Sequence, residues 1–187
     1  MRVFLGTLYT RAAALDPSYA LRGKEHLMRA LQQGPNRQIN HLSLAENYLA
    51  AQDYAQALEA ARKAVALAPQ FPEPRAALVQ IAFFMNRFDI VDEVLKENRD
   101  PQILLRIGDL YMRFSKPHLA LPFYQEILEM RPRWTAVWSR AADTLASLQR
   151  YDEAIAAARR YGELEPSEKE RVDAFIATME QQKRGVK

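Results

Sequence analysis

The 187-residue sequence contains no cysteine, only six glycines and no long apolar run. The absence of cysteine excludes disulfide bonds and thiolate metal sites, and it leaves the redox compartment undefined. The longest apolar stretch, Ala76–Met85, is far shorter than the roughly 20 residues that a membrane-spanning helix needs. The first residues also lack a convincing signal-peptide core. We therefore expect a chain that is soluble as given and that has no membrane span of its own.

Catalytic and cofactor-binding patterns are missing as well. The sequence has no glycine-rich phosphate loop, no G-x-S-x-G motif and no thiol nucleophile. Its three histidines, His26, His41 and His118, are far apart and lack the H-x-x-x-H spacing of a metal site. We expect no metal, no cofactor and no enzymatic activity.

The net charge of +3 is small, but the excess is concentrated near the N terminus. Met1–Arg37 carries six basic residues and only two acidic ones, Asp16 and Glu25. Such a segment either faces phosphates or anionic lipid, or is an ordinary solvated helix surface. We favour the second interpretation because so small an excess is common on helix surfaces. A nucleic-acid partner is not expected.

What the sequence does contain is an internal repeat. Four prolines each follow the end of a predicted helix: Pro35, Pro69, Pro132 and Pro166. The gap of 63 residues between Pro69 and Pro132 equals one repeat of 34 residues and one of 29. The repeat of 29 is five residues short. The same intervals of 34, 29 and 34 separate two further series: Tyr48, Ala82, Tyr111 and Leu145, and Ala57, Val91, Ala120 and Ala154.

Each repeat has the apolar spacing of two helices joined by a tight turn. The predicted repeats cover residues 38–71, 72–100, 101–134 and 135–168, with turns that begin at Gln52, Asn86, Ser115 and Gln149. An atypical helical hairpin over residues 1–35 precedes them. Asp100-Pro101 predicts an N-cap followed by proline at the first helical position, and Ser167–Glu170 matches a capping box that opens a capping helix over residues 167–182.

The repeat resembles the tetratricopeptide repeat over Arg37–Ser167. Repeat four has Trp138, Ala142, Leu145, Tyr151, Ala154 and Pro166 at the family's marker positions; repeat three has Ile107, Gly108, Tyr111, Ala120, Tyr124 and Pro132; and repeat one has Leu44, Ala45, Tyr48, Tyr54, Ala57, Ala64 and Pro69. Repeat two keeps Leu78, Ala82 and Phe88. The resemblance implies an all-α, right-handed superhelical solenoid. Ile127 and Tyr161 are bulkier than the alanine expected there, which predicts altered packing after repeats three and four.

Members of this family bind a peptide or a partner helix on the concave face, which is lined by the first helix of each repeat. Helical spacing places these residues there: Leu42, Glu46, Leu49, Ala76, Gln80, Phe83, Leu105, Asp109, Met112, Ser139, Asp143 and Ala146. The equivalent polar positions Glu46, Gln80, Asp109 and Asp143 form an acidic series, so we expect a basic or neutral ligand and not an acidic C-terminal peptide. The alternative is that these acids pair with Arg75, Arg113 and Arg140. Phe83, Phe84 and Phe88 are an interface cluster or, as we favour, core.

A narrower resemblance concerns Gly23–Ile39, Leu44–Tyr48 and Ala64–Pro74, which are similar to repeat tails of bacterial O-antigen ligase-like membrane proteins. It implies a soluble, extracytoplasmic docking tail that follows a membrane domain upstream of this chain. The other interpretations are a stand-alone cytoplasmic adaptor and a scaffold that self-assembles through its N-terminal hairpin. Ligand, compartment and oligomeric state stay open at this point.

Overall fold

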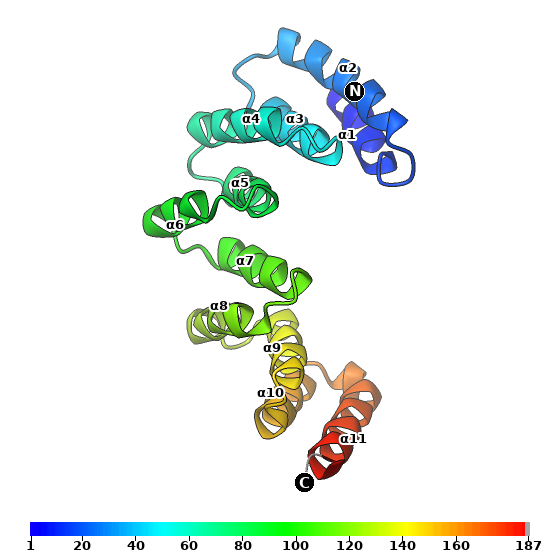
Figure 1. Ribbon diagram of the computed structural model, residues 1–187, viewed down its shortest axis with the longest axis vertical. Helices are drawn as coiled ribbons and strands as arrows, with labels where there is room; N and C mark the ends of the chain where they lie inside the picture. Colours follow the sequence, from blue (N-terminus) through cyan, green and yellow to red (C-terminus); the bar gives the residue numbers. More distant parts are fainter. Residues whose placement is uncertain (186–187) are drawn as a thin grey trace. The chain divides into compact units, whose positions relative to one another are not determined.

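The computed structural model describes residues 1–185 of the chain, and this part is helical throughout, with no β-strand (Figure 1). The helices are α1 (Arg2–Ala12), α2 (Ser18–Gln33), α3 (Gln38–Ala50), α4 (Tyr54–Leu67), α5 (Pro72–Phe84), α6 (Phe88–Glu97), α7 (Pro101–Arg113), α8 (Pro117–Met130), α9 (Thr135–Ser147), α10 (Tyr151–Leu164) and α11 (Lys169–Gly185), with a short 3₁₀ helix, η1 (Pro166–Glu168), before the last. Helices α3, α5, α7 and α9 begin at the first residues of the four repeats expected from the sequence.

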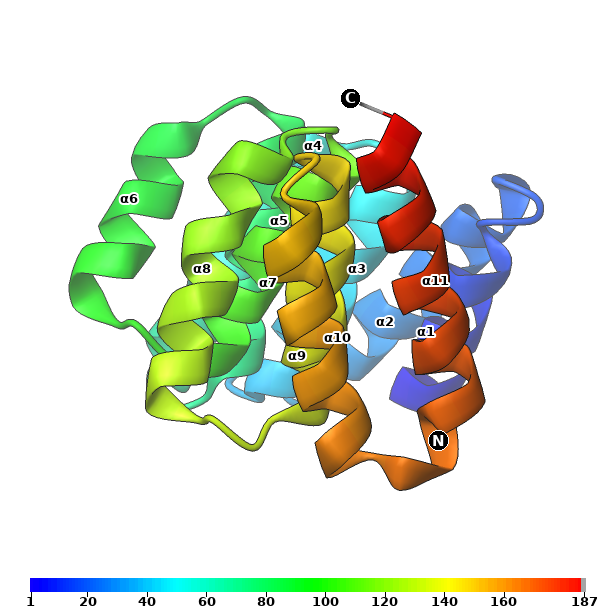
Figure 2. The same ribbon diagram turned by 90° about the horizontal axis from the view of Figure 1, so that it is seen from below.

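The chain forms two compact units, and the division falls between Ile103 and Leu104. In the first unit α1 pairs with α2, α3 with α4 and α5 with α6, and each hairpin packs on the one before it (Figure 1). In the second unit α9 and α10 form a hairpin, and α11 lies beside α10 (Figure 2). The predicted all-α array of helical hairpins is confirmed. The predicted continuity of residues 1–187 as a single domain stays a prediction.

The four repeat hairpins turn in the same way, at the predicted positions. Gln52, Asn86, Ser115 and Gln149 have φ between 54° and 60°, the left-handed conformation that ends a helix in a Schellman motif. In the first turn the Asp53 amide donates to the Tyr48 carbonyl at 2.9 Å, and the other turns repeat this bond. These bonds satisfy carbonyls that a helix end leaves without partners. None of the four residues is glycine, so the turns at Gln52, Ser115 and Gln149 carry some backbone strain, whereas asparagine at position 86 tolerates this conformation.

Small side chains lie where the two helices of a hairpin cross. Ala45 and Ala142 are buried, and a β-carbon built on Gly108 of α7 would lie 2.7 Å from Cε1 of Tyr124 on α8. A larger side chain at these positions would push the helix axes apart. The structure thus supplies the physical reason for the small residues in the repeat pattern.

Polar side chains of α3 hold the atypical N-terminal hairpin in place. The Nδ2 group of Asn47 donates to Oγ1 of Thr10 at 2.9 Å and to the Ala20 carbonyl at 3.0 Å, so one amide joins α3 to α1 and to the start of α2. Asn40 donates to the carbonyls of Ala30 and Gly34 at the other end of α2. Both asparagines are almost fully buried. The first hairpin is therefore attached by hydrogen bonds as well as by apolar packing.

A second polar contact recurs at the joints between hairpins, and we call it the linker clamp. Six residues after a linker proline, a side chain of the next helix contacts that proline's carbonyl: Nε2 of His41 lies 2.7 Å from the Pro35 oxygen, and Nε1 of Trp138 donates to Pro132 at 2.9 Å. Arg75 donates to the carbonyl of Pro69 in the same way. At the remaining joint the equivalent residue is Leu104, which has no donor.

The short repeat and the closing helix show one prediction confirmed and one corrected. Helix α6 has 10 residues, whereas α4 and α8 have 14, and Asp100 caps α7 by accepting from the Gln102 amide at 2.8 Å.

The expected capping box at Ser167 is wrong. Because Pro166 first starts a 3₁₀ turn, Ser167 lies inside that turn and its hydroxyl donates to Glu165 at 3.2 Å.

Candidate functional site

The predicted groove residues of the first unit differ in how much surface they offer. Leu42 and Phe83 are buried, with 7% and 3% of their surface exposed, so both belong to the core and leave little for a ligand. Phe83 packs edge-on against Phe88, with ring centroids 5.4 Å apart. The remaining members of the set are accessible: Glu46 is exposed, and Leu49, Ala76 and Gln80 are half-buried.

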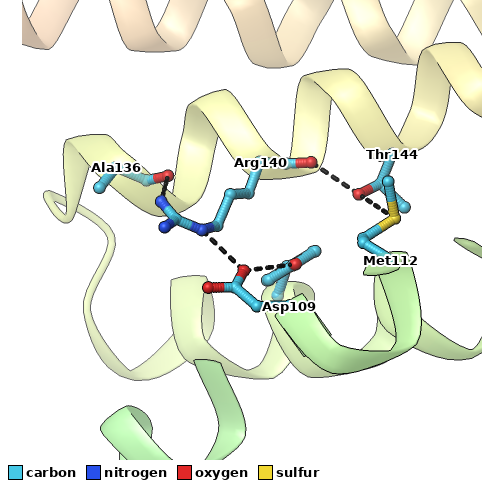
Figure 3. Close-up of polar contacts among 6 residues, drawn as sticks. Asp109, Met112, Ala136, Arg140 and Thr144 are labelled. Atoms are coloured by element: carbon cyan, nitrogen blue, oxygen red, sulfur yellow. Dashed lines mark hydrogen bonds and ion pairs between the residues drawn. The ribbon is translucent and has the colours of Figure 1, made fainter. Parts of the chain in front are cut away.

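In the second unit Asp109 of α7 is part of a hydrogen-bonded network (Figure 3). Its Oδ1 accepts from Nε of Arg140 on α9 at 2.7 Å and from the hydroxyl of Tyr124 on α8 at 2.8 Å. Arg140 also donates to the Ala136 carbonyl at 3.1 Å. Burial and the neighbouring Asp109 carboxylate raise the pKa of the Tyr124 hydroxyl well above its ordinary value. Of the two roles left open for Asp109, the structure places it in an ion pair with Arg140 that joins three helices.

Thr144 and Met112 extend this contact between α7 and α9 (Figure 3). The Thr144 hydroxyl donates to the carbonyl of Arg140 at 2.7 Å and lies 3.2 Å from the Met112 sulfur. Met112 is half-buried, whereas Thr144 is fully buried. No sequence signal pointed to Thr144, because a threonine inside a helix carries no spacing that marks a contact with another helix.

Asp143 on α9 differs from Asp109 because its carboxylate has no hydrogen-bond or ion-pair partner among the described residues. It borders a cavity of about 100 Å³ that α9, α10 and α11 enclose together. Burial raises the pKa of Asp143, and the positive charges of Arg171 and Arg140 offset that effect only in part. The cavity lining consists of Ser139, Ala142, Asp143, Ala158, Tyr161, Arg171, Val172 and Phe175.

The last two predicted positions in this unit, Leu105 on α7 and Ala146 on α9, are half-buried, as is Ser139. The structure thus brings Ser139 and Asp143 together at one cavity. Leu105 and Met112, which lie on α7, are not part of the lining of this cavity. Sequence reasoning missed that α11 supplies part of this site through Arg171 and Phe175. The signal available was the bulky Tyr161 at an expected alanine position.

Two of the three histidines lie in structural contacts, and His118 is exposed. His41 contacts a linker carbonyl, and the ring of His26 stacks on Tyr9 at 5.5 Å. Over residues 1–185 no three His, Asp or Glu side chains gather as a metal site would require. No helix in that range has the length and apolar character to cross a membrane.

Comparisons with known proteins agree with this architecture. A sequence model of the tetratricopeptide repeat matches residues 40–71 and 135–168. A search of curated proteins finds no match. Among solved structures, the chain is similar to TTC0263, a thermophilic TPR protein of Thermus thermophilus, with 18% identity, a TM-score of 0.58 and coverage of 96% of this chain and 98% of that one.

Two other solved structures are similar to a comparable degree. YrrB, described as a TPR protein with an unusual peptide-binding site, has 16% identity and a TM-score of 0.56, with 84% of each chain covered. MamA has 16% identity and a TM-score of 0.56, with 89% of this chain and 94% of that chain covered. At such identities the likeness concerns the fold. Residues 40–71 and 135–168 thus match the tetratricopeptide repeat, and the chain has a helical-hairpin fold similar to that of TPR proteins.

Proposed function

We propose that the chain is a non-catalytic scaffold that binds a peptide or a partner helix along the first helices of its hairpins. The observation that carries this proposal is that Glu46, Gln80 and Asp143 occupy equivalent positions on α3, α5 and α9 and stay accessible. Half-buried apolar residues such as Leu49 and Ala76 flank the polar positions in the first unit. Such a mixture of apolar and polar groups suits a helix or peptide laid in a groove.

The ligand that suits this surface is basic or neutral. Asp109 has its charge matched by Arg140, so in the second unit the acidic character of the surface depends on Asp143. An acidic C-terminal peptide would meet like charge at Asp143, and the cost of that encounter disfavours it.

The test is binding of the full chain to an array of basic, neutral and acidic peptides, with the double variant Glu46→Lys/Asp143→Lys as comparison. Asp109 is left unchanged because its substitution would disrupt the helix contacts. The control is Glu59→Lys/Glu129→Lys, which makes the same charge change at exposed positions of α4 and α8. We expect basic peptides to bind the wild type and the control and to lose affinity for the test variant. Equal binding by all three proteins refutes the groove.

A second candidate function is self-assembly through α1. Phe4 and Leu8 lie one turn apart on this helix, with 69% and 53% of their surface exposed. The occupant we propose is a second copy of the chain, packed as the successive hairpins of the first unit pack on one another. The exposed Arg2 and Arg11 repel their counterparts, so association should strengthen as salt screens them.

Light scattering over a concentration series tests this candidate. The variant Phe4→Gln/Leu8→Gln should be monomeric where the wild type associates, and Ile39→Gln/Leu119→Gln, at exposed apolar positions elsewhere, should behave as the wild type. A wild type that stays monomeric at high concentration and high salt ends the proposal.

The extracytoplasmic tail of an O-antigen ligase-like protein is a third candidate, supported by the resemblance of Gly23–Ile39 and Ala64–Pro74. In this case the chain would dock partners for a membrane domain and carry no transfer chemistry. The reading frame upstream of Met1 decides it: several consecutive membrane spans support a tail, and a stop codon refutes it.

A further inference from the structure

The cavity between α9, α10 and α11 is a feature that the general peptide-binding proposal does not use. We call it the Asp143 pocket. At about 100 Å³ it is far smaller than the roughly 300–1,000 Å³ of sites for drug-sized ligands, and it suits the end of one side chain. Tyr161 and Phe175, both half-buried, line it from α10 and α11. The capping helix therefore shapes a binding feature as well as covering the core.

Among the charged side chains around the pocket, one carboxylate is not part of an ion pair. Arg140 is paired with Asp109 at 2.7 Å, and Arg171 is paired with Glu168 at 3.2 Å. Asp143 is the fifth charged group, and in the part of the chain that the structure describes its carboxylate accepts no hydrogen bond. Of the five groups only Asp143 and Arg171 line the pocket, and because Arg171 has Glu168 as its partner, the Asp143 carboxylate is left over as one negative charge. A site with this balance attracts a single monovalent cation.

The residues that line the pocket include the chemical groups that bind such a cation: a carboxylate, two aromatic rings and a hydroxyl. A carboxylate forms charge-assisted hydrogen bonds with a guanidinium or an ammonium group. Aromatic faces attract the same cations through their quadrupole. The hydroxyl of Ser139, also at the pocket, offers one more acceptor. A planar guanidinium can stack on a ring while it donates to a carboxylate, whereas an ammonium group cannot stack.

We infer that the Asp143 pocket receives one cationic side chain of the bound partner, with arginine preferred over lysine. This inference rests on the proposed function, because it assumes that the occupant belongs to a peptide or protein. The inference specifies one contact between the partner and this chain. An arginine side chain of the partner enters the pocket beside α9 and contacts Asp143, Tyr161 and Phe175.

The experiment uses the full chain and a small probe, so that it does not depend on knowing the partner. The probe is Nα-acetyl-arginine methylamide, titrated into ¹⁵N-labelled protein and followed by amide chemical shifts. The matched neutral probe is the citrulline analogue, which has nearly the same shape without the charge. The protein variants are Asp143→Asn and, as control, Asp173→Asn, which removes one charge from an exposed position on α11.

We expect the arginine probe to shift the amides around Asp143, Tyr161 and Phe175, and the citrulline probe to shift them little. Asp143→Asn should weaken binding about fivefold or more, because it removes the charge from a hydrogen bond to a cation. Asp173→Asn should bind as the wild type does. Equal response to both probes, no shift at these amides, or equal weakening by the two variants overturns the pocket.

The outcomes separate this inference from the broader proposal. If the peptide array shows binding that depends on Glu46 and Asp143 but the arginine probe does not bind, the scaffold function stands and the pocket is refuted. If the probe binds at Asp143 while the array shows no peptide binding, the pocket is supported and the groove is refuted.

Discussion

Replacing Gly108 with alanine adds one methyl group at the crossing of α7 and α8. That methyl carbon would lie 2.7 Å from Cε1, 2.9 Å from Cζ and 3.2 Å from Cδ1 of Tyr124. Carbon atoms in contact prefer about 3.5–4.0 Å, so the ring must move by several tenths of an ångström or more. Tyr124 is 1% exposed and its hydroxyl is bound to Asp109, which also holds Arg140. The ring therefore has little freedom to move aside.

Two opposing terms set the size of the effect. Overpacking a close-packed interior costs about 1–3 kcal/mol. Alanine in place of glycine inside a helix gains about 1 kcal/mol. Because Gly108 is buried among fixed neighbours, the upper part of the overpacking range applies, and we expect Gly108→Ala to lower the free energy of unfolding by about 1–2 kcal/mol.

Urea denaturation followed by tryptophan fluorescence reports this change from the second unit, since both tryptophans, Trp134 and Trp138, lie there. The control is Gly162→Ala on α10, where the nearest atom to the added methyl is Cγ1 of Val172 at 3.3 Å. This contact needs only a small adjustment, so the helix-propensity term should win and stability should be unchanged or raised by up to about 1 kcal/mol. A Gly108→Ala protein as stable as the Gly162→Ala protein refutes the reasoning.

The remaining predictions concern a turn, a buried amide and a carboxylate. Gln149→Gly relieves the left-handed φ of 59° and should raise the free energy of unfolding by about 0.5–1 kcal/mol in the same assay. Asn86→Gly, followed by circular dichroism because Asn86 lies in the first unit, should change the free energy of unfolding little, since asparagine tolerates this conformation. Asn47→Ala removes two buried hydrogen bonds and should cost about 2–3 kcal/mol, with hydrogen exchange of α1 and α2 accelerated; unchanged exchange there contradicts the role of Asn47. For Asp143, burial raises the pKa in the folded state, so its contribution to stability is present at low pH and is lost as pH rises through the folded value. Asp143→Asn should therefore gain stability relative to the wild type as the pH rises from about 3 to about 7, and a relative loss over that interval contradicts it.

Much of the fold follows from local sequence signals. The prolines after each helix, the small residues at the crossings and the recurring spacing of Tyr48, Tyr111 and Leu145 locate the hairpins because each signal acts within one repeat. The turn residues were located by the same spacing, although Gln52 and Gln149 carry no glycine signal of their own.

The contacts that sequence reasoning did not predict join residues far apart in the chain. Asn47 bonds to Thr10, and Arg140 reaches Asp109 across 31 residues. Helical spacing places a residue on a face, but it does not say which polar group of another helix will meet it. For the same reason the Asp143 pocket was not predicted, since it depends on where α11 lies.

The linker clamp has a consequence for how such a chain lengthens. Donor and acceptor lie six residues apart in each case. A duplicated segment that runs from Pro35 or Pro69 through the next hairpin therefore contains both the proline carbonyl and the side chain that contacts it. The donors are a histidine, an arginine and a tryptophan, so the joint tolerates changes of residue as long as an N–H group reaches the carbonyl. A new copy of the hairpin could then drift in sequence without losing its attachment to the copy before it.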